Sequence, residues 1–348
     1  MNGTTEADPM EAAGAPAARS GEARSGRSGF GHTVEALTLA LVTVALCVFF
    51  GVWGETSATF PTTANMEALL ANQAVLGVAT LAILVPLVCN QYDLSVGANL
   101  GLSAVLAAKV LSEGAPLPAA IAVALAVGAL GGLVNGLVVT RGRVNAVVVT
   151  LGTALVMTGA VNGITGGQAI IQGIPSDLIS FGSSQTLGVP NLFLVLVVLA
   201  LLAWRVLEHM PIGRYLYALG SNEEAARLVG LRPQRLVLMS FVTAGLLAGA
   251  AGMLMVARTG GASPRVGETY TMPAFAAAFL SAAAIRPGRF NVFGAIVAII
   301  FLAVLKSGLN LAGVQPYVSD IVNGVALVAG VALAAYLGRR RLRAARGS

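Results

Sequence analysis

The sequence at 66–88 reads MEALLANQAVLGVATLAILVPLV, and it contains no charged residue after Glu67. A helix needs about 20 mostly apolar residues to cross a lipid bilayer, so this stretch predicts a membrane-spanning helix. Similar apolar runs follow one another along most of the chain. The others lie at 34–53, 94–111, 117–139, 145–164, 190–207, 236–257, 272–285, 291–311 and 316–337.

The composition agrees with a membrane protein and excludes several other classes. Of the 348 residues, 56% are hydrophobic and only 10% are charged, whereas soluble domains carry about 25% charged residues. The net charge of +6 is not a nucleic-acid footprint, because long apolar runs separate the basic residues. The 42 glycines suit close-packed membrane helices. The two cysteines, Cys47 and Cys89, lie in or beside apolar runs and are interpreted as packing residues.

The runs predict an all-α, polytopic membrane protein with about ten transmembrane helices. Two runs are weaker than the others. The run at 94–111 contains Ser95 and Asn99, and the run at 272–285 is short and contains Pro273. Either could be broken or re-entrant, which is tolerated where protein or water covers the backbone. We therefore expect eight to ten spans.

The basic residues predict the orientation of these spans. If the N-terminus is cytoplasmic and each run crosses once, 17 of the 21 Lys and Arg residues lie on the cytoplasmic side. This distribution satisfies the positive-inside rule and places both termini in the cytoplasm.

The chain ends differ in composition from the spans. Residues 1–31 are rich in Gly, Ala, Ser and Arg and predict a disordered cytoplasmic tail. Residues 339–348 form a basic tail that is expected to lie against anionic lipid headgroups. The membrane domain is therefore placed at 32–338.

The spans hold almost no ionisable residues but contain several amides and hydroxyls. A proton-coupled carrier would need a carboxylate or histidine in its core, so we expect a neutral solute and an external energy source. Amides can bind the hydroxyls of a neutral polar solute, although they can equally join helices to one another. The candidate pathway residues are Asn72, Gln73, Asn99, Asn135, Thr153, Asn310 and Asn323.

The longest basic cytoplasmic segment, 209–235, carries the signals of a short amphipathic helix. Pro211 and Gly213 are expected to break the chain after the preceding span. Ser221 or Asn222 can cap a helix over about 222–230 that has two glutamates in its first turn. Gly230 can end it. Such a helix, with Leu228, Val229 and Leu231 on one side, would let a partner dock; the alternative is a turn that only connects two spans.

Four segments carry a resemblance to a known family. The sequence from Glu224 to Gly230, with Ala225 and Ala226, resembles the EAA loop of ABC importer permeases. The surrounding IGRYLYALGSNEEAARLVGL resembles the ribose-type sugar permeases in particular. So do, in the same order and spacing, YDLSVGANLGLSAVLAA from Tyr92, VNGLVVTRGRVNAVVVTLGT from Val134 and SGLNLAGV from Ser307.

The resemblance implies a permease subunit of a binding-protein-dependent importer in the bacterial plasma membrane. Its expected partners are ATPase subunits, an extracytoplasmic sugar-binding protein and a second permease subunit, identical or similar. The chain has no Walker-type phosphate loop, so the ATP is expected to be used by the partner subunit, and no cofactor or catalytic residue is assigned to this chain. The ATPase-coupling residues implied by the family motif are Gly213, Glu223, Glu224, Ala225, Ala226 and Gly230.

Two segments depart from the family pattern. Residues 281–294 read SAAAIRPGRFNVFG where the family has a Gly-Gly-Thr-Ser stretch, and Asn90-Gln91-Tyr92 replaces a Gly-Gly-Ile type sequence. The departures leave open which solute is carried: a monosaccharide is expected, and a nucleoside or a signalling furanosyl compound is an alternative. The alternative function is a self-sufficient channel or facilitator for a small neutral solute.

Overall fold

The computed structural model describes residues 26–346, with side chains from 37 to 333, apart from 316 and 319, and at 336. Most of the predicted tail at 1–31 lies outside these residues, and residues 26–31 belong to the first helix. The basic tail at 339–348 lies outside the described side chains, although the last helix continues to Arg346.

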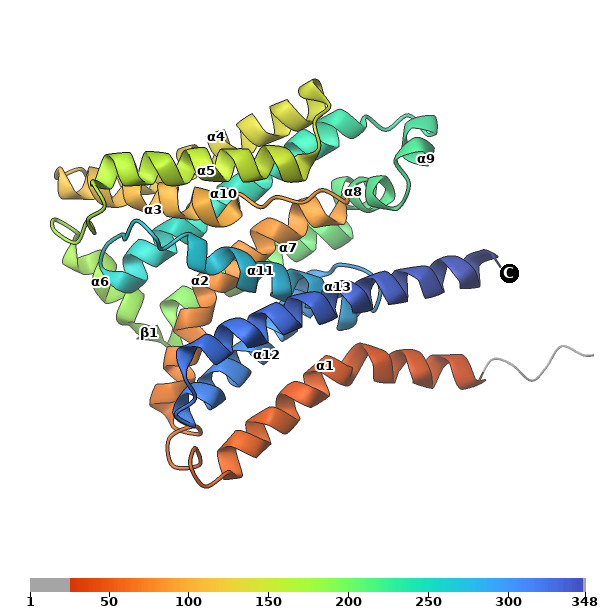
Figure 1. The fold of residues 1–348 in the computed structure, drawn as a ribbon, viewed down its shortest axis with the longest axis horizontal. Helices are drawn as coiled ribbons and strands as arrows, with labels where there is room; N and C mark the ends of the chain where they lie inside the picture. Colours follow the sequence, from red (N-terminus) through yellow and green to blue (C-terminus); the bar gives the residue numbers. More distant parts are fainter. Residues whose placement is uncertain (1–25, 347–348) are drawn as a thin grey trace, which may run out of the picture.

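The described chain is all-α apart from one short hairpin (Figure 1), as the sequence predicts. The hairpin pairs β1 (Gln185–Thr186) with β2 (Val189–Pro190). The helices are α1 (Gly26–Val52), α2 (Thr63–Val88), α3 (Val96–Ser112), α4 (Leu117–Gly142), α5 (Ala146–Thr165), α6 (Ser176–Ser183), α7 (Asn191–Trp204), α8 (Pro211–Ser221), α9 (Glu223–Leu228), α10 (Pro233–Thr259), α11 (Glu268–Leu280), α12 (Val292–Leu311) and α13 (Pro316–Arg346), with a π-helical turn at Arg205–His209 and a 3-10 turn at Ser281–Ala283.

Each of the ten apolar runs coincides with a helix. Within the described residues, six helices are long and apolar enough to cross a membrane: α2, α4, α5, α7 with its π-helical turn, α10 and α12. The two runs with the weakest signal give short helices, 17 residues in α3 and 13 in α11. The number of crossings beyond these six remains a prediction.

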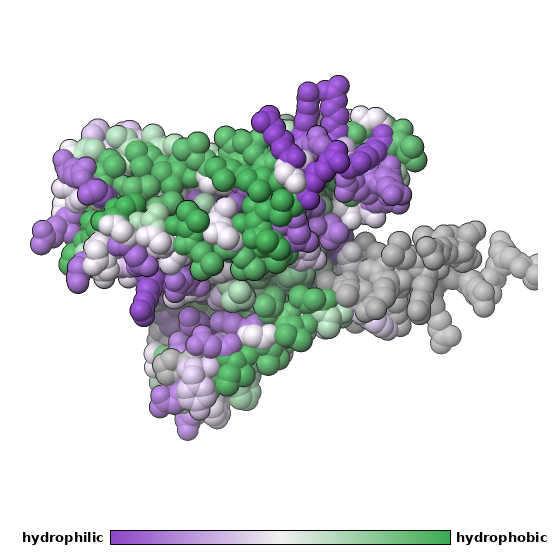
Figure 2. Space-filling model, turned by 45° about the horizontal axis from the view of Figure 1, so that its top comes forward, coloured by the Kyte–Doolittle hydropathy of each residue, from purple (hydrophilic) through white to green (hydrophobic). Residues whose placement is uncertain are grey.

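Helices α2 and α10 form the centre of the bundle. In the most apolar window of each, 72% of α2 and 61% of α10 are buried, against 22–28% for α4, α5 and α7. Helix α10 packs against α4, α2 and α3. The outer helices expose large apolar side chains such as Val198 (56%) and Leu202 (57%) of α7, and Figure 2 shows a broad hydrophobic surface with hydrophilic residues gathered toward its ends. This surface suits contact with lipid.

Helix α10 packs on α4 with backbone against backbone. A Cβ atom on Gly245 of α10 would lie 2.1 Å from the carbonyl oxygen of Gly128 in α4. A Cβ atom on Gly132 would lie 2.1 Å from the carbonyl oxygen of Phe241. Any side chain at these positions would force the helices apart, as at the small-residue interfaces of membrane helices in general.

The first turns of α3 and α11 meet inside the bundle. A Cβ atom on Gly97 would lie 2.5 Å from the carbonyl oxygen of Gly267, and one on Gly267 would lie 2.2 Å from that of Gly97. Of the non-helical residues leading into α3, Asp93 and Ser95 are buried, with 2% and 0% exposure. Irregular backbone is thus covered by protein, which is the condition for interrupted helices in a membrane.

The contact between α4 and α10 predicts a sharp difference between two Gly→Ala substitutions. Gly245→Ala is expected to destabilise the protein by about 1–3 kcal/mol, because the new methyl group meets the backbone of α4. Gly324→Ala, in open space on α13, is expected to be neutral or slightly stabilising. Thermal unfolding of the two purified variants in detergent measures the difference. Equal unfolding temperatures would show that the glycine contact does not hold the bundle together.

Candidate functional site

The segment between α7 and α10 contains two helices where the sequence predicts one. The chain bends at Met210, and Pro211 occupies the first turn of α8. The prediction that Gly213 breaks the chain is wrong, since Gly213 lies within α8. Its function there is packing: a Cβ atom at this position would lie 2.1 Å from the carbonyl oxygen of Leu207. The close approach folds α8 back against the end of the preceding helix.

The predicted cap of the second helix is confirmed. The Asn222 side chain accepts a hydrogen bond from the Ala225 backbone N–H at 3.0 Å, and Glu223 and Glu224 occupy the first turn. The helix, α9, ends at Leu228, two residues before the glycine expected to stop it. Gly230 follows with a φ of +85°, a backbone conformation that favours glycine.

Helix α9 presents apolar side chains to the outside of the molecule. Leu228 is 89% exposed and Val229 is 76% exposed, whereas Ala226 beneath them is buried. Figure 1 shows α9 at the far end of the bundle, beyond α4 and α10. The two side chains are therefore available to a partner that approaches this end.

Helix α8 is attached to the segment that joins α11 to α12. The Tyr217 hydroxyl donates a hydrogen bond to the Phe290 carbonyl oxygen at 2.6 Å, and the Arg289 guanidinium lies 3.5 Å from the centre of the Tyr217 ring. Burial raises the pKa of Tyr217, an effect that the nearby Arg289 charge opposes. Arg286 pairs at 2.8 Å with the buried carboxylate of Glu208, in the π-helical turn that leads into α8. We call these contacts the latch.

The sequence analysis missed the latch, although it identified 281–294 as unusual. The segment is an ordered turn in which Ile285 has a φ of +61°. The Asn291 amide donates to the carbonyl oxygens of Ser281 and Ala284 and accepts from the Gly294 N–H. The only sequence signal for the latch was the pair of arginines, Arg286 and Arg289, in one segment and the pair of tyrosines, Tyr215 and Tyr217, in the other.

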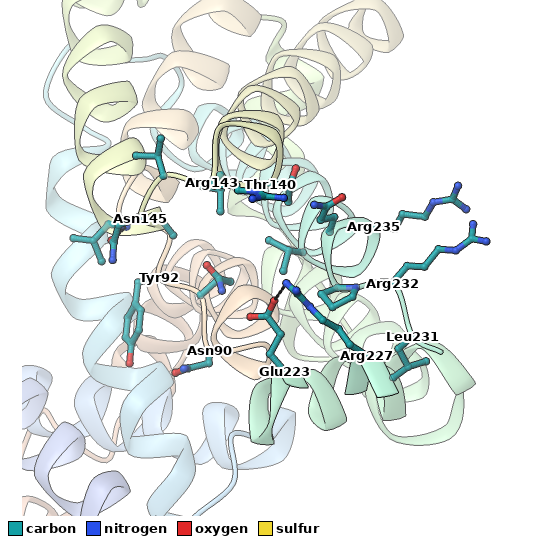
Figure 3. Close-up of a pocket in the computed structure, with 18 residues that line it drawn as sticks. Asn90, Tyr92, Thr140, Arg143, Asn145, Glu223, Arg227, Leu231, Arg232 and Arg235 are labelled. Carbon is teal, nitrogen blue, oxygen red and sulfur yellow. Dashed lines mark hydrogen bonds and ion pairs between the residues drawn. The ribbon is translucent and has the colours of Figure 1, made fainter. Parts of the chain in front are cut away.

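A cavity of about 1250 Å³ opens at the same end of the bundle. Its wall joins the residues after α2 to the start of α10 and to α9 (Figure 3). Tyr92 lines it, half exposed and stacked on Phe279 at 6.3 Å between ring centroids. The paired Glu223 and Arg227 lie on its wall, and Arg143, Arg232 and Arg235 also line it. We call it the arginine-lined cavity.

A second cavity, of about 510 Å³, lies between the N-terminal half of α2 and the C-terminal half of α12. It brings together four of the seven candidate pathway residues, from α2, α12 and α13: Asn72, Gln73, Asn310 and Asn323. Asn72 accepts a hydrogen bond from Arg258 at 2.9 Å. We call this space the amide cavity.

The other three candidates lie elsewhere and make hydrogen bonds between helices. Thr153 donates to the side-chain oxygen Oδ1 of Asn135 at 2.7 Å, and the side-chain Nδ2 of Asn135 donates to the Ser95 hydroxyl at 2.7 Å. Ser95 in turn donates to Asp93 at 2.6 Å. Asn99 donates to the Gly128 carbonyl oxygen at 3.0 Å. These residues tie α3 to α4 and α5, and the sequence analysis gave no role to Asp93.

The part of the chain that matches known proteins includes most of the helices described above. Residues 65–331 match the family model described as "Branched-chain amino acid transport system / permease component". No solved structure matches the chain.

Among similar proteins, the ribose import permease protein RbsC of Escherichia coli (strain K12) is 34% identical, over 83% of this chain and 91% of that protein. RbsC of Bacillus subtilis (strain 168) is 32% identical, over 77% of this chain and 84% of that protein. The D-allose transport system permease protein AlsC of E. coli (strain K12) is 29% identical, over 83% of this chain and 89% of that protein. The chain thus belongs to this family, and it is a multi-pass permease subunit of an ABC importer in the bacterial plasma membrane.

Proposed function

We propose that this chain forms the membrane pathway for a monosaccharide or a similar neutral polar solute. A separate ATPase subunit binds α8 and α9, and an extracytoplasmic binding protein delivers the solute to the other face. The observation that carries the proposal is the exposure of two apolar side chains, Leu228 and Val229, at the end of α9. Helix α8, which precedes α9, contacts elements that line the amide cavity.

The distribution of arginines supports the orientation. The loop after α4 and the segments around α8, α9 and the latch are rich in arginine, and they lie at one end of the bundle. By the positive-inside rule this end faces the cytoplasm. The proposal retains about ten crossings with both termini cytoplasmic, and α3 and α11 are its interrupted elements.

The exposed tip of α9 suits an ATPase that binds from the cytoplasm. Leu228 and Val229 are neighbours in the chain, and both side chains are largely exposed at the end of the bundle that carries the arginines. The Asn222 cap and the Glu223–Arg227 pair hold the helix beneath them. A partner can therefore bury these two side chains without first folding the segment.

The packing of α8 provides a route from the ATPase to the pathway. A Cβ atom on Gly220 would lie 2.1 Å from the carbonyl oxygen of Val88, at the end of α2. Through the latch, α8 also contacts the segment between α11 and α12. Helices α2, α11 and α12 all line the amide cavity. Movement of α8 would thus act on three of its walls.

The solute class is supported by the relatives and by the cavity. The names of the relatives specify ribose, D-allose and autoinducer 2 import, and the amide cavity holds side chains that can bind hydroxyl groups. Asn99, Asn135 and Thr153 are retained as candidates only for an indirect function in holding the helices that surround the pathway.

The exposed face of α5 supports a second permease subunit. Gly152, Gly159 and Gly163 each face open space, and the amide of Asn162 is exposed on the same helix. Closely spaced small residues allow membrane helices to approach, and an amide in the bilayer gains from a partner. The proposal places a second subunit, identical or similar, on this face.

Replacing Glu224 and Gly230 together tests the docking of the ATPase. The variant Glu224→Arg/Gly230→Ala reverses a charge in the first turn of α9 and places a side chain at a φ of +85°. It is expected to remain in the membrane, to lose most of its co-purification with the cognate ATPase and to lose ATP-driven uptake at least tenfold. Pull-down with the ATPase and uptake by reconstituted vesicles measure both effects.

Glu113→Arg/Gly114→Ala, just after the C-terminal end of α3, is the matched control. Gly114 there has a φ of +86° and faces open space, as Gly230 does. The control is expected to retain the ATPase. Light scattering of the complex between this control variant and the ATPase is expected to give a mass that includes two permease subunits. Normal ATPase binding and uptake by the α9 variant would refute the docking site, and a single permease subunit in the complex would refute the second subunit.

Removing one hydroxyl tests the latch. Tyr217→Phe loses the hydrogen bond to Phe290 but keeps the ring beneath Arg289. Uptake is expected to fall several-fold, while the ATPase remains bound and hydrolyses ATP, because the contact that transmits its movement is weakened. Tyr215→Phe, an exposed tyrosine on the same helix, is the control. Equal uptake per ATP hydrolysed by both variants would exclude the latch from coupling.

A further inference from the structure

We infer that the amide cavity is a binding site within the permease for a neutral polyhydroxylated solute, and that it discriminates against amino acids. The inference rests on the proposed function and deepens it by naming the solute chemistry and the residues that select it. The description of the matching family refers to branched-chain amino acids, and the names of the relatives to sugars. The structure of the cavity favours the second class.

The polar groups of the cavity suit a solute with several hydroxyl groups better than a solute with one charged group. Amides from three helices face the space, with Gln73 on α2, Asn310 on α12 and Asn323 on α13. Each amide offers two donors and an acceptor, and each sugar hydroxyl can donate and accept. The amides are distributed around the space, as a solute with several hydroxyls requires.

Two further amides are held in place by contacts with neighbouring elements. Asn72 accepts from both Nε and Nη2 of Arg258, at 3.2 and 2.9 Å. Asn65 accepts from the Ser307 hydroxyl at 2.9 Å and donates to the Phe60 carbonyl oxygen at 2.9 Å. These bonds orient part of the cavity wall before any solute arrives.

Gln73 has a hydrogen-bonding capacity that the protein leaves unused. Its Oε1 atom is buried and has no donor within the described part of the chain. A buried acceptor without a donor is costly, so turning this amide toward a solute hydroxyl would be favourable. The two other buried side-chain atoms without a partner belong to Asn99 and Ser103 of α3, and neither residue lines this cavity.

The charge around the cavity disfavours an amino acid. Lys306, exposed at its edge, is the one charged residue in the described lining, and no carboxylate lines the space. An amino acid is a zwitterion: Lys306 could pair with its carboxylate, but its ammonium group would lose water without gaining an acidic partner in the described lining, which costs binding energy. A neutral solute meets no such penalty.

The remaining surface and the size also suit a sugar. The half-buried Tyr270 and the side chains of Leu69, Leu76 and Leu302 provide an apolar wall for C–H groups. The Tyr270 hydroxyl is directed to the Met255 sulfur at 3.4 Å, which fixes the ring. The volume of about 510 Å³ lies within the usual range of small-molecule sites, about 300–1000 Å³.

Saturation-transfer difference NMR on the full chain in lipid nanodiscs tests the site, because this method detects weak binding. D-ribose and D-allose serve as polyhydroxylated probes and L-leucine as the amino acid probe. The wild-type protein is expected to give signals for the sugars at least fivefold above that for leucine. Gln73→Leu is expected to reduce the sugar signals at least fivefold, and Gln73→Glu, which keeps an acceptor, to retain most of them.

Gln185→Leu is the matched control, since this exposed glutamine lies on β1, away from the cavity. Thermal unfolding confirms that each variant is folded. Absence of sugar signals in the wild type, equal sugar signals in Gln73→Leu and Gln185→Leu, or a leucine signal as strong as that of the sugars would overturn the inference.

ATP-driven uptake by the assembled importer separates this site from the proposed function. Normal sugar uptake combined with unchanged binding by Gln73→Leu refutes the site and leaves the function standing. Absence of ATP-driven uptake by the wild-type assembly refutes the function, and the difference between the two glutamine variants still decides the site.

Discussion

Close contact between glycine backbones in α4 and α10 is the constraint on which the rest of the bundle depends. Because Gly128 and Gly245 leave no side chain between the two helices, α4 is held firmly against the central α10. The same central helix packs on α2 and α3. Hydrogen bonds from Asn135 and Asn99 then secure α3 to its neighbours. Helices α3, α4, α5 and α10 thereby form one block.

Helices α1, α12 and α13 form a second group outside this block. They extend away from it in Figure 1, and their main contacts are with one another, with α2 and with α11. The amide cavity lies among α2, α11, α12 and α13. The latch connects to this second group through Phe290 and Arg286. The site expected to hold solute is therefore in the part of the molecule that the docking segment contacts through α8.

The sequence predicted the parts of the structure that depend on local signals. Each of the ten apolar runs became a helix, and within the described residues six of these helices are long and apolar enough to cross a membrane. The cap at Asn222 was also predictable, since the cap and the amide it binds are three residues apart. The weak runs with Ser95 and Pro273 became the short helices α3 and α11.

Contacts between distant residues were not predictable in the same way. Tyr217 and Phe290 are 73 residues apart, and Asn65 and Ser307 are 242 residues apart. Nothing in the spacing separates an amide that lines a cavity, such as Gln73, from one that joins helices, such as Asn135. The difference arises only from which helices become neighbours. Gly213 was misinterpreted for the same reason, because its close contact with Leu207 depends on how α8 folds back.

The most direct test of the account compares sugar flux into vesicles that contain this chain alone with flux into vesicles that also contain its ATPase and binding protein. The account predicts no flux through the chain alone, and uptake against a gradient only when both partners and ATP are present. Rapid flux of the sugar through the purified chain, without ATP or partners, would show a self-sufficient channel and contradict the account.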